Sequence, residues 1–159
     1  MTGVITSSLA AEALEVLDRV GPMPFRALAA ALRLPRDRWD RLAKAVRAMH
    51  AAGCASLRRA RGIEFVVPAH AWGFRPDRQE RLAWFAARLL EAGGRFEGGR
   101  AFFPKGLSCP VAVVPPDVEI PPGCVAVLDG FGKPPPGAAY GCRAEELKVM
   151  PLGRCLRRV

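Results

Sequence analysis

The placement of proline divides this chain into two kinds of sequence. Ten of its fifteen prolines lie in residues 101–159, where they separate short apolar runs. Proline interrupts helices, and in sheets it is confined to strand ends, edges and turns, because it has no backbone N–H to donate. The last third of the chain is therefore predicted to be a small β-rich module, with strands expected at 101–103, 111–114, 124–128 and 147–150.

The first fifty residues have helical periodicity instead. A helix that begins at Ser7 or Ser8, either of which is a good capping residue, is expected to run to about Arg19. A short second helix is expected from Phe25 to Leu32. Pro35 then requires a turn before the next element.

A third helix is expected between Pro35 and Gly53, with Asp37 as its cap. Its apolar residues fall on one side at helical spacing: Trp39, Leu42, Val46 and Met49. Arginine and lysine occupy the opposite side. The segment is therefore predicted to be an amphipathic helix with a cationic outer face.

A hairpin is expected directly after this helix. Two β-type runs, Cys54–Arg59 and Ile63–Val67, are joined by a turn in which Gly62 can adopt a positive φ. Alternate residues of the second run are apolar, so one face of the hairpin is expected to be buried. Three arginines lie at its tip, and the hairpin is therefore basic.

The net charge of +9 is concentrated in one segment. Residues 33–61 hold nine basic and two acidic residues, a net charge of +7, whereas the other 130 residues carry +2. A basic helix by itself is equally well explained as a solvated surface. A basic hairpin next to it favours contacts with the phosphates of a nucleic acid.

The order helix, helix, basic helix, glycine and basic hairpin over residues 8–68 resembles the winged helix-turn-helix domain of bacterial regulators. The run LAAALRLPRDRWDRLAKAV matches its pattern of a small-residue helix, a Leu-Pro turn and a recognition helix. Trp39 departs from the pattern, which usually has a smaller residue there. The resemblance implies that the third helix enters the major groove of DNA and that the hairpin reaches phosphates or the minor groove.

The same resemblance implies a set of DNA-binding residues. They are Arg36, Arg38, Arg41, Lys44, Arg47, Arg58, Arg59 and Arg61. The first three lie near the start of the recognition helix and are expected at base edges. The other five are expected on phosphates, where they set register rather than sequence preference.

A further amphipathic helix is expected from Arg78 to Ala92, ended by the two glycines that follow. Trp84 lies outside its apolar stripe and is expected on the polar face, beside Arg81 and Arg88. A large exposed aromatic residue calls for a second contact, either with the C-terminal segment or with a second copy of the chain. We favour a homodimer formed through this helix.

Evidence for catalytic or metal chemistry is weak. The five cysteines are scattered without a CxxC pair, so buried reduced thiols are expected, with a zinc site of the four C-terminal cysteines as the alternative. Asp129 after an apolar run, followed by Glu146 and Lys148, resembles the Mg²⁺-binding core of restriction-type nucleases. Solvated surface charge is the preferred interpretation of these three residues, and no cofactor or small-molecule site is expected.

Together these features predict an α+β protein in three parts. Residues 1–71 would form the winged helix-turn-helix domain, 72–100 a connecting helix and 101–159 the proline-rich β module. The expected function is sequence-specific binding of double-stranded DNA by a homodimeric, non-enzymatic transcriptional regulator. The alternative is a DNA- or protein-binding component of a phage or plasmid nucleoprotein assembly. Without a signal peptide or an apolar run of about 20 residues, a cytoplasmic location is expected and no membrane contact.

Overall fold

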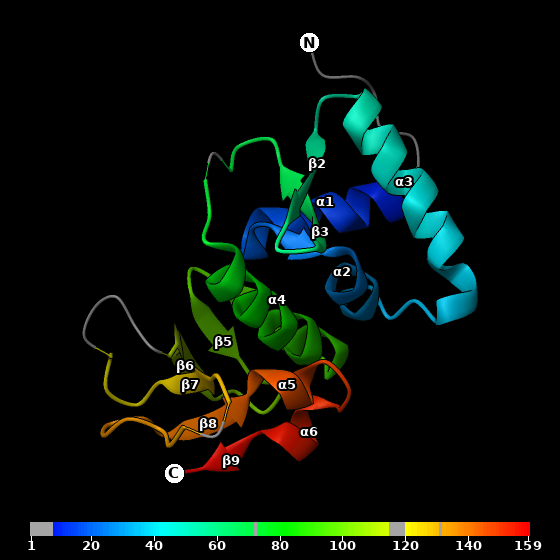
Figure 1. Cartoon of the computed structure of the whole chain (residues 1–159). Coiled ribbons are helices and arrows are strands. Elements are labelled where there is room, and N and C mark those ends of the chain that lie inside the picture. Colours follow the sequence, from blue (N-terminus) through cyan, green and yellow to red (C-terminus); the bar gives the residue numbers. More distant parts are fainter. Residues whose placement is uncertain (1–7, 72, 115–119, 131) are drawn as a thin grey trace. The chain divides into compact units, whose positions relative to one another are not determined.

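The computed structural model describes residues 8–71, 73–114, 120–130 and 132–159 (Figure 1). It is a mixture of helices and two sheets, as the expected α+β class requires. The chain forms two compact units, and the boundary between Ala83 and Trp84 falls inside helix α4 (Pro76–Glu91). In the described part of the chain, no helix is long and apolar enough to cross a membrane.

The helices of the N-terminal unit lie where the periodicity predicts them, with one change. The elements are α1 (Ser8–Val20), α2 (Phe25–Ala31), the 3₁₀ turn η1 (Arg36–Arg38) and α3 (Trp39–Ala51). Ser7, one of the two expected caps of α1, lies outside the described residues. The expectation that Asp37 caps the third helix is wrong. The segment begins as a 3₁₀ turn that contains Asp37, and Arg38, which precedes α3, makes no side-chain capping bond.

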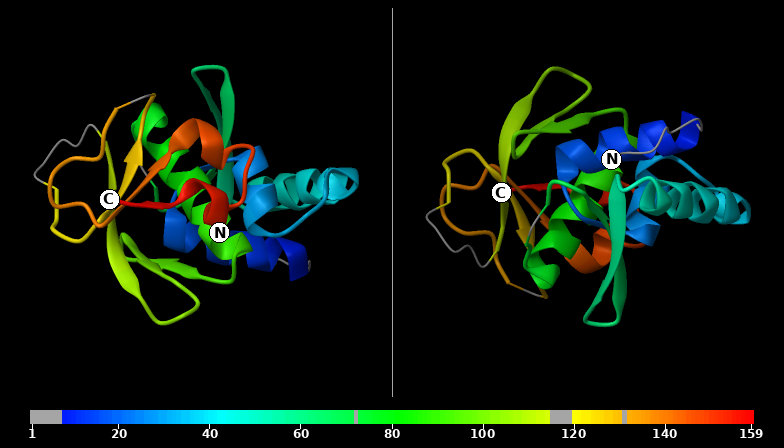
Figure 2. Two further views of the ribbon diagram at one scale, coloured as in Figure 1. Left: turned by 90° about the horizontal axis from the view of Figure 1, so that it is seen from below. Right: turned by 90° about the horizontal axis from the view of Figure 1, so that it is seen from above.

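A three-stranded antiparallel sheet completes this unit. Its strands are β1 (Met23–Pro24), β2 (Ala55–Ala60) and β3 (Ile63–Pro68), in the order β1-β3-β2. Strand β3 is central, and its residues from Phe65 to Pro68 are all buried, so the expected alternation of buried and exposed residues holds only near the turn. Figure 2 shows the β2–β3 hairpin, in teal to green, as a ribbon that extends beyond the helices of its unit. Its tip therefore has solvent on both faces.

The C-terminal unit is built on a six-stranded mixed sheet with the order β4-β5-β6-β7-β8-β9. Its strands are β4 (Arg95–Glu97), β5 (Arg100–Phe102), β6 (Ser108–Val113), β7 (Val125–Leu128), β8 (Tyr140–Arg143) and β9 (Arg157–Arg158). Pairing is parallel in the centre, from β6 to β8, and antiparallel towards both edges. Strand β7 is buried along its whole length, as expected for the inner strand of a parallel region.

The strand expected at 147–150 is wrong. Leu147 ends the short helix α5 (Ala144–Leu147), and the backbone N–H groups of Val149 and Met150 both bond back to the carbonyl of Glu146. Three of the expected strands overlap β5, β6 and β7, but β4, β8 and β9 were not expected. A second short helix, α6 (Leu152–Cys155), precedes β9. Leu147 is fully buried, so its apolar side chain contributes to the core as part of a helix rather than of a strand.

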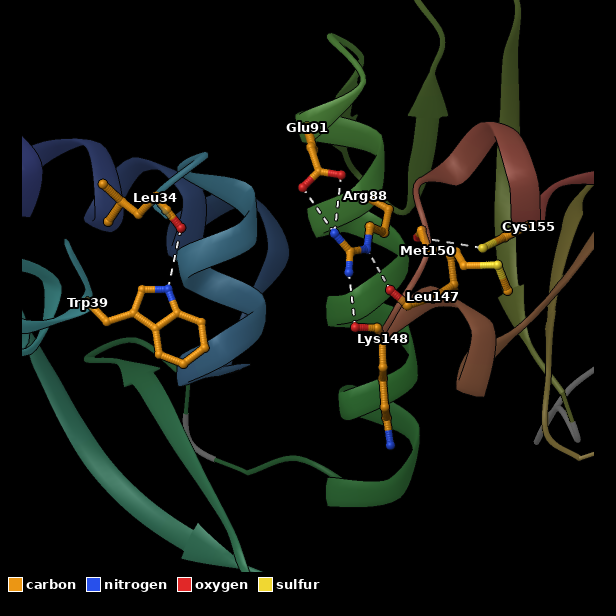
Figure 3. Close-up of polar contacts among 8 residues, drawn as sticks. All are labelled: Leu34, Trp39, Arg88, Glu91, Leu147, Lys148, Met150 and Cys155. Carbon is orange, nitrogen blue, oxygen red and sulfur yellow. Dashed lines mark hydrogen bonds and ion pairs between the residues drawn. The ribbon is translucent and has the colours of Figure 1, made fainter. Parts of the chain in front are cut away.

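Arg88 of α4 ties this helix to the end of α5 (Figure 3). Its Nε donates to the carbonyl of Leu147 at 2.6 Å and its Nη2 to that of Lys148 at 3.0 Å. Its Nη1 donates to both carboxylate oxygens of Glu91, at 3.2 and 3.0 Å. The guanidinium thus satisfies carbonyl groups that the end of a helix leaves without a partner.

The expectation that Trp84 is exposed on a polar face is wrong. Its side chain is 8% exposed, and the Arg88 guanidinium lies over its ring, 5.4 Å from the centroid. The polar face of α4 at this position is therefore an internal surface, because Arg88 is occupied by bonds within the unit. Trp84 consequently offers no large exposed ring to a second copy of the chain.

Arg88→Met should lower the free energy of unfolding of the C-terminal unit by about 3 kcal/mol, because the Arg88 side chain is 13% exposed and its partners would lose their donor. Urea denaturation followed by circular dichroism measures the change. Lys105→Met is the matched control, since it removes the same charge from an exposed position without hydrogen bonds in the described structure. Equal losses in the two variants would contradict the role given to Arg88.

Helix α4 ends as the two glycines predict. The N–H of Gly93 (φ +92°) bonds to the carbonyl of Leu90 at 3.0 Å, and that of Gly94 to the carbonyl of Leu89 at 2.9 Å. This is a Schellman motif. A Cβ atom at Gly94 would lie 2.5 Å from Leu89 Cδ1 and 2.7 Å from the backbone oxygen of Phe102. Glycine at position 94 therefore allows β5 to approach the end of the helix.

Gly94→Ala should destabilise the C-terminal unit by about 2 kcal/mol or more, since the added methyl group meets backbone that cannot rotate away. Gly153→Ala is the control, because a Cβ there meets nothing within 4 Å and the residue lies inside α6. That variant should be neutral or more stable by up to about 1 kcal/mol. Midpoints of urea denaturation compare the two, and a tolerated Gly94→Ala would show that β5 is not held close.

Candidate functional site

The eight cations expected to bind DNA lie on consecutive elements of the N-terminal unit. Two are on η1, three on α3, two on β2 and one in the β2–β3 turn: Arg36, Arg38, Arg41, Lys44, Arg47, Arg58, Arg59 and Arg61. All eight are exposed. Within the residues that the structure describes, none of them makes a hydrogen bond or an ion pair. Their charges are therefore available to an anionic partner.

The turn between α2 and α3 sets where the basic segment begins. The N–H of Arg33 bonds to Ala30 and that of Leu34 to Ala29, both at 3.0 Å, so α2 ends in a Schellman motif with Arg33 in the left-handed region (φ +56°). Pro35 follows in an extended conformation and cannot prolong the helix. This reversal separates the two helices and exposes η1.

Helix α3 is amphipathic as expected. Leu42, Ala45, Val46 and Met49 are buried, and the cations lie on the other side. The helix ends at a second Schellman motif, in which the N–H of Gly53 (φ +76°) bonds to His50 at 3.1 Å and that of Cys54 to Met49 at 2.9 Å. The hairpin therefore starts at a fixed angle to the helix.

Trp39 was placed on the buried stripe of α3, but it is only half-buried, at the edge of that stripe. Its Nε1 donates to the carbonyl of Leu34 at 3.4 Å (Figure 3), and its ring meets that of Phe25 edge-on at 6.2 Å between centroids. Arg36 lies over the indole, with its Cζ 5.8 Å from the ring centroid. Trp39 thus belongs partly to the basic surface.

A groove of about 580 Å³ runs between α1 and α3. Its basic residues are Arg38, Arg41 and Lys44, and apolar residues such as Leu9 and Leu34 also line it. The sequence did not indicate that α1 contributes to this surface, because the residues of α1 lie about thirty positions earlier and carry no charge pattern that relates them to α3. Only the packing of the two helices brings them together.

The hairpin holds its three arginines differently. Arg58 lies over the ring of Phe74 (5.7 Å), which itself packs on Phe65 with centroids 5.0 Å apart. Arg59 stands opposite Glu64 in the strand register, on the other face of the hairpin. Phe74 was not expected here, because it follows the hairpin and lies in no recognisable motif.

Arg61 occupies the turn in an unusual backbone conformation. Its φ is +52° and that of Gly62 is +74°, so the hairpin has a two-residue turn with both central residues left-handed, as in type I′. A positive φ was expected at Gly62 but not at Arg61, which was expected only to lie at the hairpin tip. Nearby, the backbone N–H of Arg78 lowers the pKa of Asp77, burial opposes this, and the positive charges of Arg61 and Arg75 lower the pKa further.

The residues of the nuclease-like pattern are not arranged on adjacent strands. Glu146 lies in helix α5 with its Oε1 3.6 Å from Arg157 Nη2, and the Nζ of Lys148, just after that helix, is 3.8 Å from Glu145 Oε2. Asp129 follows β7 and is exposed. In the parts of the chain that the structure describes, no group of three or more His, Cys, Asp or Glu could hold a metal ion.

The cysteines are free thiols, and the four in the C-terminal unit are buried. Burial raises the pKa of each of the four, and it raises that of Cys142 to about 12, with Cys155 and Glu146 acting in the same direction. A thiol with such a pKa carries almost no thiolate near neutral pH and is a poor nucleophile. These residues therefore behave as small apolar side chains.

Arg61→Asn should raise the thermal stability of the N-terminal unit, by up to about 1 kcal/mol, because asparagine adopts the left-handed conformation at lower cost than arginine. Arg59→Asn removes the same charge from an extended position of β2, where asparagine is unfavourable, and should not stabilise. Differential scanning calorimetry compares the two variants. A stability for Arg61→Asn below that of Arg59→Asn would contradict the assigned turn.

The chain matches no family model, and neither the curated proteins nor the solved structures contain a match to it. The candidate surface consists of the exposed cations of η1, α3 and the β2–β3 hairpin.

Proposed function

We propose that the N-terminal unit is a winged helix-turn-helix domain that binds double-stranded DNA with sequence preference. The observation that carries this proposal is the set of eight exposed cations on α3, η1 and the hairpin, none of which is paired within the described residues. Two exposed acids, Asp37 and Asp40, lie among these cations, and Glu12 lines the groove between α1 and α3, but basic residues outnumber acids by nine to two in residues 33–61. A surface with such an excess of positive charge suits a polyanion.

The order of elements supports the proposal. In chain order the elements are α1-β1-α2-η1-α3-β2-β3, and the sheet has the order β1-β3-β2, in which the two hairpin strands are neighbours. In the proposed winged helix, α3 would be the recognition helix and the hairpin would be the wing. The two-residue strand β1, which was not expected, is the element that completes it.

The dimensions of the basic surface also fit a duplex. An α-helix fits the major groove, and α3 presents Arg41, Lys44 and Arg47 along thirteen residues. Arg36 and Arg38 precede it, where side chains reach base edges. The hairpin cations would meet phosphates on the neighbouring backbone.

The proposal extends to a regulatory role. We infer that the chain acts as a homodimeric transcriptional regulator in the cytoplasm and that the C-terminal unit serves assembly or partner contact. Trp84 is not the anchor of that dimer, because its ring is buried within the chain. A two-fold arrangement would show itself as an inverted repeat in the preferred DNA site.

Selection from a random duplex library at low salt should yield a short preferred site, and the affinity for it should fall steeply as salt rises. If the five cations assigned to phosphates make those contacts, the slope of log K against log salt is about −4.5. Failure of the folded protein to retain any duplex at low salt would refute DNA binding. Retention without sequence preference would favour an assembly protein over a regulator.

Arg59→Ala should weaken binding to all duplexes alike and make the salt slope shallower by about one unit, because one phosphate contact is lost. Lys105→Ala, at an exposed position of the C-terminal unit, removes an equal charge outside the basic surface and should change neither quantity. Fluorescence anisotropy over a range of salt concentrations measures both variants. An equal effect of the two substitutions would mean that net charge alone, rather than this surface, binds DNA.

A further inference from the structure

Among the eight exposed cations, Arg36 is held in place by an aromatic ring. Its guanidinium carbon lies over the indole of Trp39, 5.8 Å from the centroid, within the range of a cation–π contact. The two residues are three positions apart across η1, and side chains at i and i+3 of a 3₁₀ turn lie one above the other. The 3₁₀ turn at the start of the basic segment therefore creates the stack.

The indole is itself fixed. Its Nε1 donates to the carbonyl of Leu34 at 3.4 Å, and Phe25 of α2 meets its ring at an interplanar angle of 84°. Figure 3 shows the indole nitrogen directed at the Leu34 carbonyl. Two contacts from outside α3 thus determine the orientation of the ring on which Arg36 lies.

The contact with Trp39 leaves the N–H donors of the Arg36 guanidinium available for bonds to a base. A guanidinium binds an aromatic face through its π surface and presents its N–H donors as a planar fork. Within the described residues, Arg36 makes no hydrogen bond or ion pair, so these donors are uncommitted. By contrast, Arg41, Lys44 and Arg47 on the same surface have no ring contact. They must lose rotational freedom on binding, whereas Arg36 has already lost much of its own.

We propose that Trp39 is a positioning residue that holds Arg36 ready for a bidentate bond to a guanine edge, and that Arg36 is the main determinant of sequence preference. This inference rests on the proposed DNA binding, and it assigns the recognition of one base pair to Arg36. It also accounts for a large aromatic residue where the winged-helix pattern usually has a smaller one. The preferred site should accordingly contain a G·C pair whose identity depends on position 36.

The chain offers a matched stack as a control. Arg58 on β2 lies over Phe74 at 5.7 Å, almost the same distance. It belongs to the hairpin, which is expected to meet phosphates. Substitution of arginine by lysine keeps the positive charge at both positions. It removes the planar guanidinium from the proposed base contact in Arg36→Lys and from the hairpin in Arg58→Lys.

The experiment compares Arg36→Lys, Arg58→Lys, Trp39→Leu and Trp39→Phe with the unchanged protein. Each is tested on the site selected by the unchanged protein and on that site with every base pair exchanged in turn. Arg36→Lys should lower discrimination at one G·C pair by about tenfold while non-specific affinity is kept. Trp39→Leu should lower the discrimination at the same G·C pair by about threefold to tenfold. Trp39→Phe, which keeps an aromatic face, should retain most of it.

The double variant Trp39→Leu/Arg36→Lys should lose no more discrimination than Arg36→Lys alone, because the ring acts through the arginine. Arg58→Lys should leave the preference at every pair unchanged. Unaltered circular dichroism of each variant shows that the fold is intact.

Three results would overturn the inference: an unchanged preference in Arg36→Lys, a loss at a different base pair in Trp39→Leu, or equal losses in Trp39→Phe and Trp39→Leu. Duplex binding by the unchanged protein without sequence preference also overturns it, although DNA binding itself then stands. If the unchanged protein retains no duplex at all, the proposed function fails first. The two failures are thus distinguishable.

Discussion

The left-handed residue at the end of each long helix is the constraint on which the arrangement of this chain depends. Helices α1, α2, α3 and α4 are each followed by a residue with positive φ: Gly21, Arg33, Gly53 and Gly93. After α2, α3 and α4, two N–H groups bond back to the last carbonyls of the helix, and after α1 the N–H of Gly21 bonds back to Leu17. Because the reversals are fixed by hydrogen bonds, the elements after them start in defined directions. The basic turn η1 and the basic hairpin both begin directly after such a reversal.

Two of the left-handed positions in the described chain are not glycine, and both are arginine. Arg33 ends α2, and Arg61 forms the tip of the hairpin. Backbone in this region disfavours a residue with a Cβ, so the arginine at each place carries a local conformational cost. Both residues lie within the segment that holds most of the net charge.

Local chemistry made part of this structure predictable from the sequence. The stripe of Leu42, Val46 and Met49 and the glycine at position 62 specify α3 and the hairpin, because helical spacing and positive φ are properties of a few neighbouring residues. Burial that arises from distant residues was not predictable. Trp84 has a polar sequence context but lies under Arg88, and Leu147 looks like a strand residue but ends a helix that Arg88 holds. The contributions of α1 and Phe74 to the basic surface were not predictable either, because they also depend on contacts between residues that are distant in the sequence.

The two edges of the six-stranded sheet have a consequence for self-association. Strand β4 is three residues long, with Arg95 and Glu97 exposed, and β9 is two residues long, both of them exposed arginines. Short charged edge strands resist the addition of a further strand, because each offers only a few hydrogen bonds and a second β9 strand would bring arginines together at that edge. Two copies of this chain are therefore discouraged from forming a continuous sheet. Two copies that associate would pack through other surfaces and would not add strands to the edges of this sheet. The sheet is therefore protected from growing by the addition of further copies.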